Sequence, residues 1–144
     1  MLTSEIARRE TLVGLILSAV ARFCHCRIRF EYSLYVNQWL KGNLDYFLRG
    51  HATFFVVEAK NDDLTRGFTQ LAVELIALAE VESQDIFYGA VTLGDVWQFG
   101  TLDRQARSIT QDITLYRVPD DLAPLMDILI GILQGKKSLA ETGE

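Results

Sequence analysis

Three charged residues in one short stretch have the types and spacing of a site for a divalent metal ion. Asp45 interrupts an apolar run, and the apolar run Phe54–Val57 leads directly into Glu58 and, two residues later, Lys60. Residues two apart on a strand share a face, so Glu58 and Lys60 would be neighbours at the end of a core strand. If residues 50–53 connect a hairpin, Asp45 lies directly across from Glu58, with Cβ atoms about 5 Å apart. Two carboxylates at that distance repel unless a cation lies between them, and Mg²⁺ or Mn²⁺ prefers such oxygen ligands.

The pattern of Asp45 followed by Glu58-Ala59-Lys60 resembles the PD-(D/E)xK signature of the restriction-endonuclease-like superfamily. The resemblance implies that Asp45, Glu58 and the carbonyl of Ala59 bind Mg²⁺ or Mn²⁺, and that Lys60 positions or activates the attacking water. It also implies an αβββαβ core, a mixed α/β sheet with helices on both faces. Leu44 replaces the proline that gives the motif its name, as in many superfamily members. A Glu-Lys pair at a strand end is also commonly a solvated ion pair.

Other polar residues are candidates to support this site. The superfamily often places a metal-linked Glu on its first helix, which implies this role for Glu10, with Glu5 as the alternative and a solvated helix charge as a third interpretation. Glu31 could reach the site from the polar face of a predicted strand, where solvation is the default. Gln70 resembles the glutamine of the Q-x-x-x-Y element of RecB-like and type I restriction nucleases, although Glu74 stands in place of the tyrosine. Gln70 therefore either supports the site or substrate, or is a solvated residue.

Periodicity predicts the elements that must position these residues. A helix capped by Thr3 or Ser4 is expected to run to about Phe23, and the helix that carries Gln70 and Glu74 is expected to turn both away from its core stripe. The other expected elements are a half-exposed antiparallel strand over 27–36, the hairpin around 50–53, the second helix ending near 81, a second hairpin around 94–95, a strand over 112–118 and a last helix over 122–133.

The second hairpin carries a string that is similar to the G-x-x-T-x-G-x-x-W-x-F hairpin of many small members of the superfamily. In this chain it runs from Gly89 to Phe99. Trp97 and Phe99 alternate onto one face, so the string is assigned to core packing and not to chemistry.

Length and composition fit a single domain over residues 1–134, followed by a polar tail over 135–144 that is expected to be disordered. The chain has 144 residues, of which 49% are hydrophobic, and a net charge of −5. It therefore lacks the overall basic field that favours nucleic acid, although a local basic groove can exist. Candidates for contacts with backbone phosphates are Lys41, Arg49, Arg66 and the pair Arg8-Arg9.

The sequence has no evident signal peptide and no apolar stretch long enough to cross a bilayer. Cys24 and Cys26 flank His25, and a disulfide between positions two apart would be badly strained. Zinc would need a further ligand and a better spacing. We therefore expect reduced thiols, a cytoplasmic location and no membrane partner.

The leading prediction is a Mg²⁺-dependent endo- or exonuclease, with DNA favoured as the substrate. The alternative is a catalytically silent or partner-dependent module of the same fold that binds nucleic acid or protein, because fold does not fix function. A third interpretation is a structural dimer in which the three charges form an ion-pair network. The terminal helix is apolar nearly all round, which predicts a homodimer interface there.

Overall fold

The computed structural model describes residues 2–38, 40–50, 53–59 and 63–135. These residues form three helices and six strands: α1 (Leu2–Cys24), β1 (Arg27–Tyr35), β2 (Lys41–Arg49), β3 (Phe54–Ala59), α2 (Leu64–Val81), β4 (Ile86–Thr92), β5 (Val96–Asp103), β6 (Ser108–Arg117) and α3 (Leu122–Leu133). The strands build one sheet in the order β1-β2-β3-β4-β5-β6. β3 and β4 are parallel, and the other neighbouring strands are antiparallel. The protein is therefore a mixed α/β protein with a mixed sheet.

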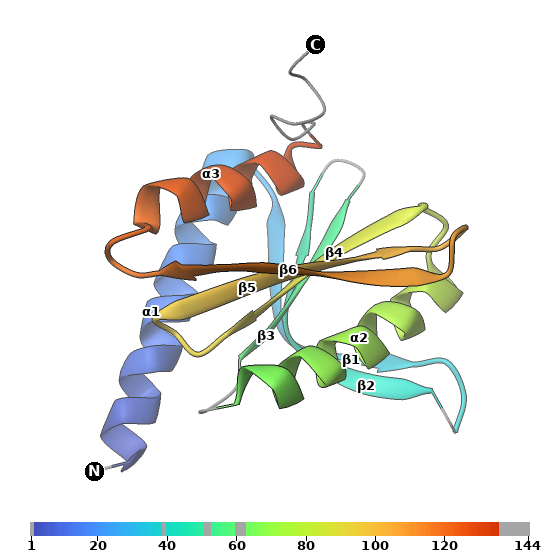
Figure 1. Cartoon of the computed structure of the whole chain (residues 1–144), viewed down its shortest axis with the longest axis horizontal. Coiled ribbons are helices and arrows are strands. Elements are labelled where there is room, and N and C mark those ends of the chain that lie inside the picture. Colours follow the sequence, from blue (N-terminus) through green and yellow to red (C-terminus); the bar gives the residue numbers. More distant parts are fainter. Residues whose placement is uncertain (1, 39, 51–52, 60–62, 136–144) are drawn as a thin grey trace.

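The helices cover both faces of the sheet, as expected from the sequence (Figure 1). α1 and α3 share one face with a core that includes Val13, Leu17, Val20, Tyr46, Leu48, Trp97, Phe99, Leu125 and Leu129. α2 covers the other face with a second core that includes Leu44, Phe47, Val56, Leu71, Leu75, Leu78, Phe87 and Val91. The alternation of neighbouring residues between the two cores follows from the period of two along a strand. It places Trp97 and Phe99 in one core, as predicted.

Two glycines allow α2 to lie close to the sheet. Gly89 on β4 is paired with Gly100 on β5. A Cβ atom on Gly89 would lie 2.7 Å from Cδ1 of Leu71, and one on Gly100 would lie 2.6 Å from Cε2 of Phe68. The position of α2 over β4 and β5 therefore depends on the absence of side chains there.

Most predicted elements are confirmed, with two corrections. The connection over residues 50–53, the turn over 94–95 and the helix over 122–133 lie where the sequence predicts them. α1 already includes Thr3 and Ser4, so neither residue is its cap. β6 begins at Ser108 and not at Asp112. The first half of β6 is exposed at the edge of the sheet, so it lacks the apolar alternation that marks a half-buried strand.

α3 finds part of its apolar cover within the chain. Leu125, Leu129 and Leu133 are buried in the core shared with α1, and Met126, Ile128, Ile130 and Ile132 pack against it and are partly buried. A homodimer through α3 stays a prediction. Within the described residues, each helix is too short or too polar to span a bilayer. Apart from Gly135, the tail expected to be disordered lies outside the described residues.

Candidate functional site

The hairpin of β2 and β3 has the register that the sequence predicts. The pairs run from Tyr46↔Val57 to Arg49↔Phe54, and the backbone N–H of Gly50 donates to the carbonyl of Thr53 at 2.9 Å. The ladder ends at Tyr46↔Val57, and Asp45 and Glu58 are the next residue on each strand, so a continued register would place them opposite each other. We refer to these two residues as the carboxylate pair.

The carboxylate pair lies at the end of a central strand. Glu58 is only 3% exposed, and Asp45 is half-buried. Val56 packs under α2, and Glu58, two residues further along β3, turns to the same side. An ionised carboxylate in such a place must be paired, hydrogen-bonded or bound to a metal ion, because its desolvation is costly.

Glu31 on β1 lies opposite Asp45 on β2. The flanking pairs Phe30↔Tyr46 and Tyr32↔Leu44 fix this position, and Glu31 has a positive φ of 53°. The alternation of β2 changes at the same point, because Leu44 packs under α2 whereas Tyr46 packs under α1. Irregularities of this kind re-aim side chains and are frequent beside functional sites. Glu31 itself is exposed, in agreement with the solvated interpretation.

The donor set of the carboxylate pair and the Ala59 carbonyl is suited to a hard divalent ion. Ala59 is the last residue of β3 and is paired with Thr92 of β4. Within residues 2–38, 40–50, 53–59 and 63–135, no three His, Cys, Asp or Glu side chains gather closely enough to hold a metal ion. The proposed donor set has two carboxylate side chains and one main-chain carbonyl, which is fewer than three ligating side chains. Lys60, the predicted water-positioning residue, lies outside the described residues.

Helix α1 brings Glu10 within electrostatic reach of β2. Burial raises the pKa of Tyr46 above its ordinary value, and the carboxylates of Glu10 and Asp45 raise it further. Glu10 is exposed, and its neighbour Arg9 packs at the turn between β4 and β5, where a Cβ on Gly94 would lie 2.9 Å from that of Arg9. Glu10 and Asp45 therefore both act on Tyr46, which packs on the α1 side of the sheet. The side chain of the alternative, Glu5, lies outside the described residues.

The predicted shared face of Gln70 and Glu74 is wrong for Glu74. Gln70 is exposed, whereas Glu74 is 1% exposed and lies on the buried side of α2. Glu74 falls three residues after Leu71 and four before Leu78, which are both buried, so the helical stripe carries it inward. This spacing was the signal for a buried carboxylate. Gln70 faces solvent, as either a substrate contact or a solvated residue would.

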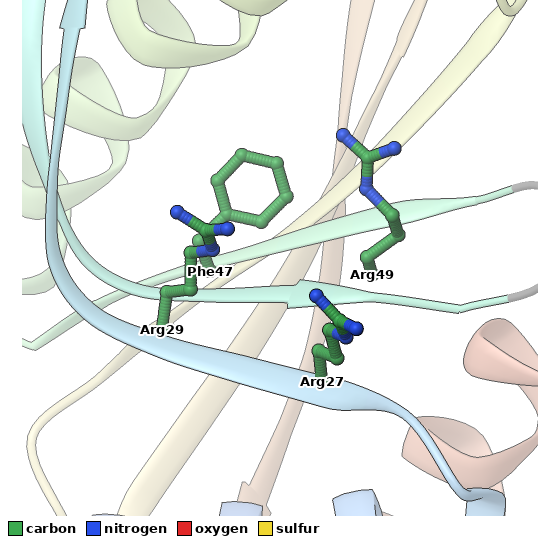
Figure 2. A pocket seen from close by; sticks show the side chains of 4 residues that line it. All are labelled: Arg27, Arg29, Phe47 and Arg49. Atoms are coloured by element: carbon green, nitrogen blue, oxygen red, sulfur yellow. The ribbon is translucent and has the colours of Figure 1, made fainter.

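A pocket of about 350 Å³ lies beside this region, lined by Arg27, Arg29, Phe47 and Arg49 (Figure 2). Arg27 and Arg29 come from β1, and Phe47 and Arg49 come from β2. The register pairs Arg27 with Arg49 and Arg29 with Phe47. The three arginines are exposed, whereas Phe47 is 5% exposed and lies at the base of the group. We name this feature the arginine pocket.

The sequence indicated only one of these arginines. Arg49 was a phosphate candidate, whereas Arg27 and Arg29 were assigned to the polar face of a strand. Their spacing of two was the available signal, but only the pairing with β2 brings the three together. Arg8 and Arg66 are exposed elsewhere on α1 and α2, and the side chain of Lys41 lies outside the described residues.

Comparisons with known protein families, with curated proteins and with solved structures each found no match to this chain. The class of the protein is therefore defined by its fold. It is a mixed α/β protein with a six-stranded sheet between α2 on one face and α1 with α3 on the other.

Proposed function

We propose that this protein is a divalent-metal-dependent phosphodiesterase that acts on nucleic acid through a PD-(D/E)xK-type site. The supporting observation is that Asp45 and Glu58 directly adjoin the last pair of the β2–β3 ladder, Tyr46↔Val57, at the end of the central strand β3. The element order α1-β1-β2-β3-α2-β4 also reads αβββαβ, with β4 parallel to β3. Both features agree with a restriction-endonuclease-like core.

In this proposal, Asp45, Glu58 and the Ala59 carbonyl hold Mg²⁺ or Mn²⁺. A divalent ion held there would supply a lowered pKa for a water molecule and neutralise charge on the phosphate. Lys60 follows two residues after Glu58 and would orient the attacking water or stabilise the pentacovalent phosphorus. Glu10 and Asp45 both raise the pKa of Tyr46, so the negative charge of Glu10 would favour the retention of a cation near Asp45.

One observation favours a catalytically silent module instead. Glu58 is 3% exposed, which leaves its carboxylate little access to a hydrated ion and a substrate. The net charge of −5 also disfavours tight binding of nucleic acid by the protein as a whole. A silent module would keep the fold and the arginine pocket and would have no metal-dependent property at Asp45.

Thermal unfolding with and without millimolar Mn²⁺ or Mg²⁺ tests the proposal. A ligand that binds only the native state adds about 2.7 kcal/mol to the free energy of unfolding at a hundredfold excess over Kd. We expect the melting temperature of the wild type to rise, the rise to vanish in Asp45→Asn, and the rise to persist in Asp127→Asn, which removes an exposed carboxylate on α3.

Cleavage of labelled DNA and RNA oligonucleotides under the same conditions completes the test. Metal-dependent cleavage by the wild type and by Asp127→Asn, with none by Asp45→Asn, is the expected result. A wild type with neither a metal effect nor cleavage would support the silent module. Equal cleavage by Asp45→Asn would place the chemistry elsewhere in the chain.

A further inference from the structure

We infer that the arginine pocket is a binding site for a phosphoryl group of a nucleic-acid strand. The choice of a nucleic acid as the ligand rests on the proposed function. The affinity for a phosphoryl anion rests on the pocket alone, since Arg27, Arg29 and Arg49 line a single space (Figure 2).

The register of β1 and β2 makes an anion the natural complement of this pocket. Arg27 and Arg49 are directly opposite each other, and like charges at such positions destabilise a strand pair. Arg29 lies two residues from Arg27 along β1 and projects on the same side. A bound anion converts this repulsion into attraction to all three side chains.

The chemistry of the pocket selects phosphate among anions. Guanidinium groups are planar, remain charged at all relevant pH values and bind phosphate oxygens through pairs of parallel N–H donors. Phe47 gives the group an apolar lining residue, and the pairing of Arg27 with Arg49 and of Arg29 with Phe47 puts the arginine stems on one side of the sheet. A phosphoryl group offers several oxygens to donors that converge from β1 and β2, which a single carboxylate cannot do as well.

One acidic side chain already contacts this pocket. Nη2 of Arg49 lies 3.8 Å from Oε2 of Glu82, at the end of α2. Arg49 is 62% and Glu82 is 29% exposed, so water and salt screen the pair. A phosphoryl group can therefore compete with Glu82 for Arg49.

The pocket lies at a useful distance from the carboxylate pair. Arg29, Phe47 and Val56 form one row across β1, β2 and β3, and Glu58 is two residues beyond Val56. Two strand spacings and two residue rises separate the Cα atoms of Arg29 and Glu58 by about 12 Å. At a rise of about 3.4 Å per nucleotide, this spans three to four nucleotides. The arginine pocket would hold a phosphate that lies about three to four nucleotides along the nucleic-acid strand from the phosphate at the carboxylate pair.

The position of β1 allows a nucleic-acid strand to reach the arginine pocket from solvent. β1 is the first strand of the sheet and is hydrogen-bonded to β2 on one side. Charged residues on an edge strand also protect against aggregation, which is the competing explanation of these arginines. That explanation predicts no selective affinity for phosphate.

Fluorescence anisotropy with labelled single-stranded DNA, in EDTA to prevent hydrolysis, tests the inference. Removal of one phosphate contact lowers the slope of log affinity against log salt by about 0.7 for a single strand. We expect this loss in Arg29→Ala and, because bidentate geometry is lost while charge is kept, a weaker defect in Arg29→Lys. Arg117→Ala, which removes an exposed arginine from β6 at the other edge, serves as the matched control.

Two further arms separate the possible sources of the phosphoryl group. A preference for a 5′-phosphorylated over a 5′-hydroxyl oligonucleotide that vanishes in Arg29→Ala identifies a terminal phosphate. Equal binding of the two with the same arginine dependence identifies an internal backbone phosphate. Inorganic phosphate should compete more strongly than chloride at equal ionic strength.

The outcomes distinguish this inference from the proposed function. Arginine-dependent binding that persists in Asp45→Asn, without any cleavage by the wild type, would retain the pocket and reject the phosphodiesterase. Cleavage and binding that are unchanged in Arg29→Ala and in the double variant Arg27→Ala/Arg49→Ala would overturn the pocket and leave the phosphodiesterase intact. Melting curves of each variant confirm that the protein tested is folded.

Discussion

Arg27 and Arg49 are paired directly across β1 and β2, so two side chains of like charge start from opposite positions of one strand pair. The printed pairs of β2 and β3 end at Tyr46↔Val57, and the next residue of each strand is a carboxylate, Asp45 on β2 and Glu58 on β3. Like charges at directly opposite positions of a strand pair repel each other, and Arg49 also has the carboxylate of Glu82 at 3.8 Å. Under the proposed function, a metal ion at the carboxylate pair and a phosphate at the arginine pocket would each neutralise one of the two pairs.

Arg27→Thr should raise the free energy of unfolding in a low-salt buffer without phosphate. The substitution removes the Arg27–Arg49 repulsion and introduces a residue suited to strands, and cross-strand pairs of this kind contribute about 0.2–1 kcal/mol. Chemical denaturation measures the change. Phosphate should stabilise the wild type more than chloride of equal ionic strength does, and should lose this advantage in the variant.

The control for this experiment is Arg117→Thr on β6, which should leave the phosphate effect unchanged because Arg117 is remote from the pocket. A variant at Arg27 that is less stable than the wild type, with the phosphate effect intact, would show that Arg27 stabilises the edge strand and does not serve anion binding.

Gly50→Ala should lower the free energy of unfolding by about 1–3 kcal/mol, the usual cost of forcing additional atoms into a packed site. A Cβ atom there would overlap the backbone carbonyl of Leu133, so no side-chain rotation relieves the contact. The end of α3 therefore holds the connection between β2 and β3, on which the position of Glu58 depends.

Gly131→Ala is the matched substitution within α3, since nothing lies within 4 Å of a Cβ atom at that position. It should raise stability by about 0.5–1 kcal/mol, because alanine is the better helix former. Equal effects of the two substitutions in urea denaturation would mean that α3 does not contact the hairpin connection.

The sequence predicted those features that depend on local order. Gly94-Asp95 set the second turn, and the spacing of strand-forming residues around 50–53 set the β2–β3 register from Tyr46↔Val57 to Arg49↔Phe54. It did not predict the arginine pocket, because Arg27 and Arg29 meet Arg49 only through pairing of β1 with β2. The sequence analysis also placed Glu74 on the solvent face of α2, because a glutamate is expected at an exposed position. Only its spacing of three residues from Leu71 indicates that Glu74 is buried.

Cys26 should react slowly with alkylating reagents in the folded protein. Burial, together with the neighbouring Cys24, raises the pKa of its thiol from 9.0 to about 11. At pH 8 the thiolate would then be about one hundredfold rarer than in the unfolded chain, since two pKa units are a hundredfold in the equilibrium. Alkylation followed by mass spectrometry, before and after unfolding in guanidinium, measures the difference.

The sign of the accompanying stability change follows from the raised pKa. The folded state retains the proton more tightly, so this contribution is complete below about pH 9 and is lost as the pH rises towards 11. In Cys24→Ser the pKa of Cys26 should fall, because the charge of the second thiolate is removed. An alkylation rate at Cys26 that is equal in the folded and unfolded chains would contradict the burial of this thiol.

Glu10→Gln should lower the pKa of Tyr46 towards its ordinary value, without restoring it fully. Burial is the main cause of the raised pKa and remains, whereas the repulsion between the Glu10 carboxylate and the phenolate is removed. Ultraviolet difference titration of tyrosinate measures the shift, and Tyr46→Phe identifies which titration step belongs to this residue. Glu80→Gln, an exposed glutamate on α2, should leave that step unchanged.

Asp45→Asn should lower the same pKa, because Asp45 is the other carboxylate that raises it. The phenol of Tyr46 is then a reporter placed between the first helix and the carboxylate pair. If Glu10→Gln leaves the titration of Tyr46 unchanged while Asp45→Asn shifts it, Glu10 lies too far away to support a cation at Asp45. The role that the first helix has in the proposed metal site would then have to be abandoned, although the carboxylate pair itself would stand.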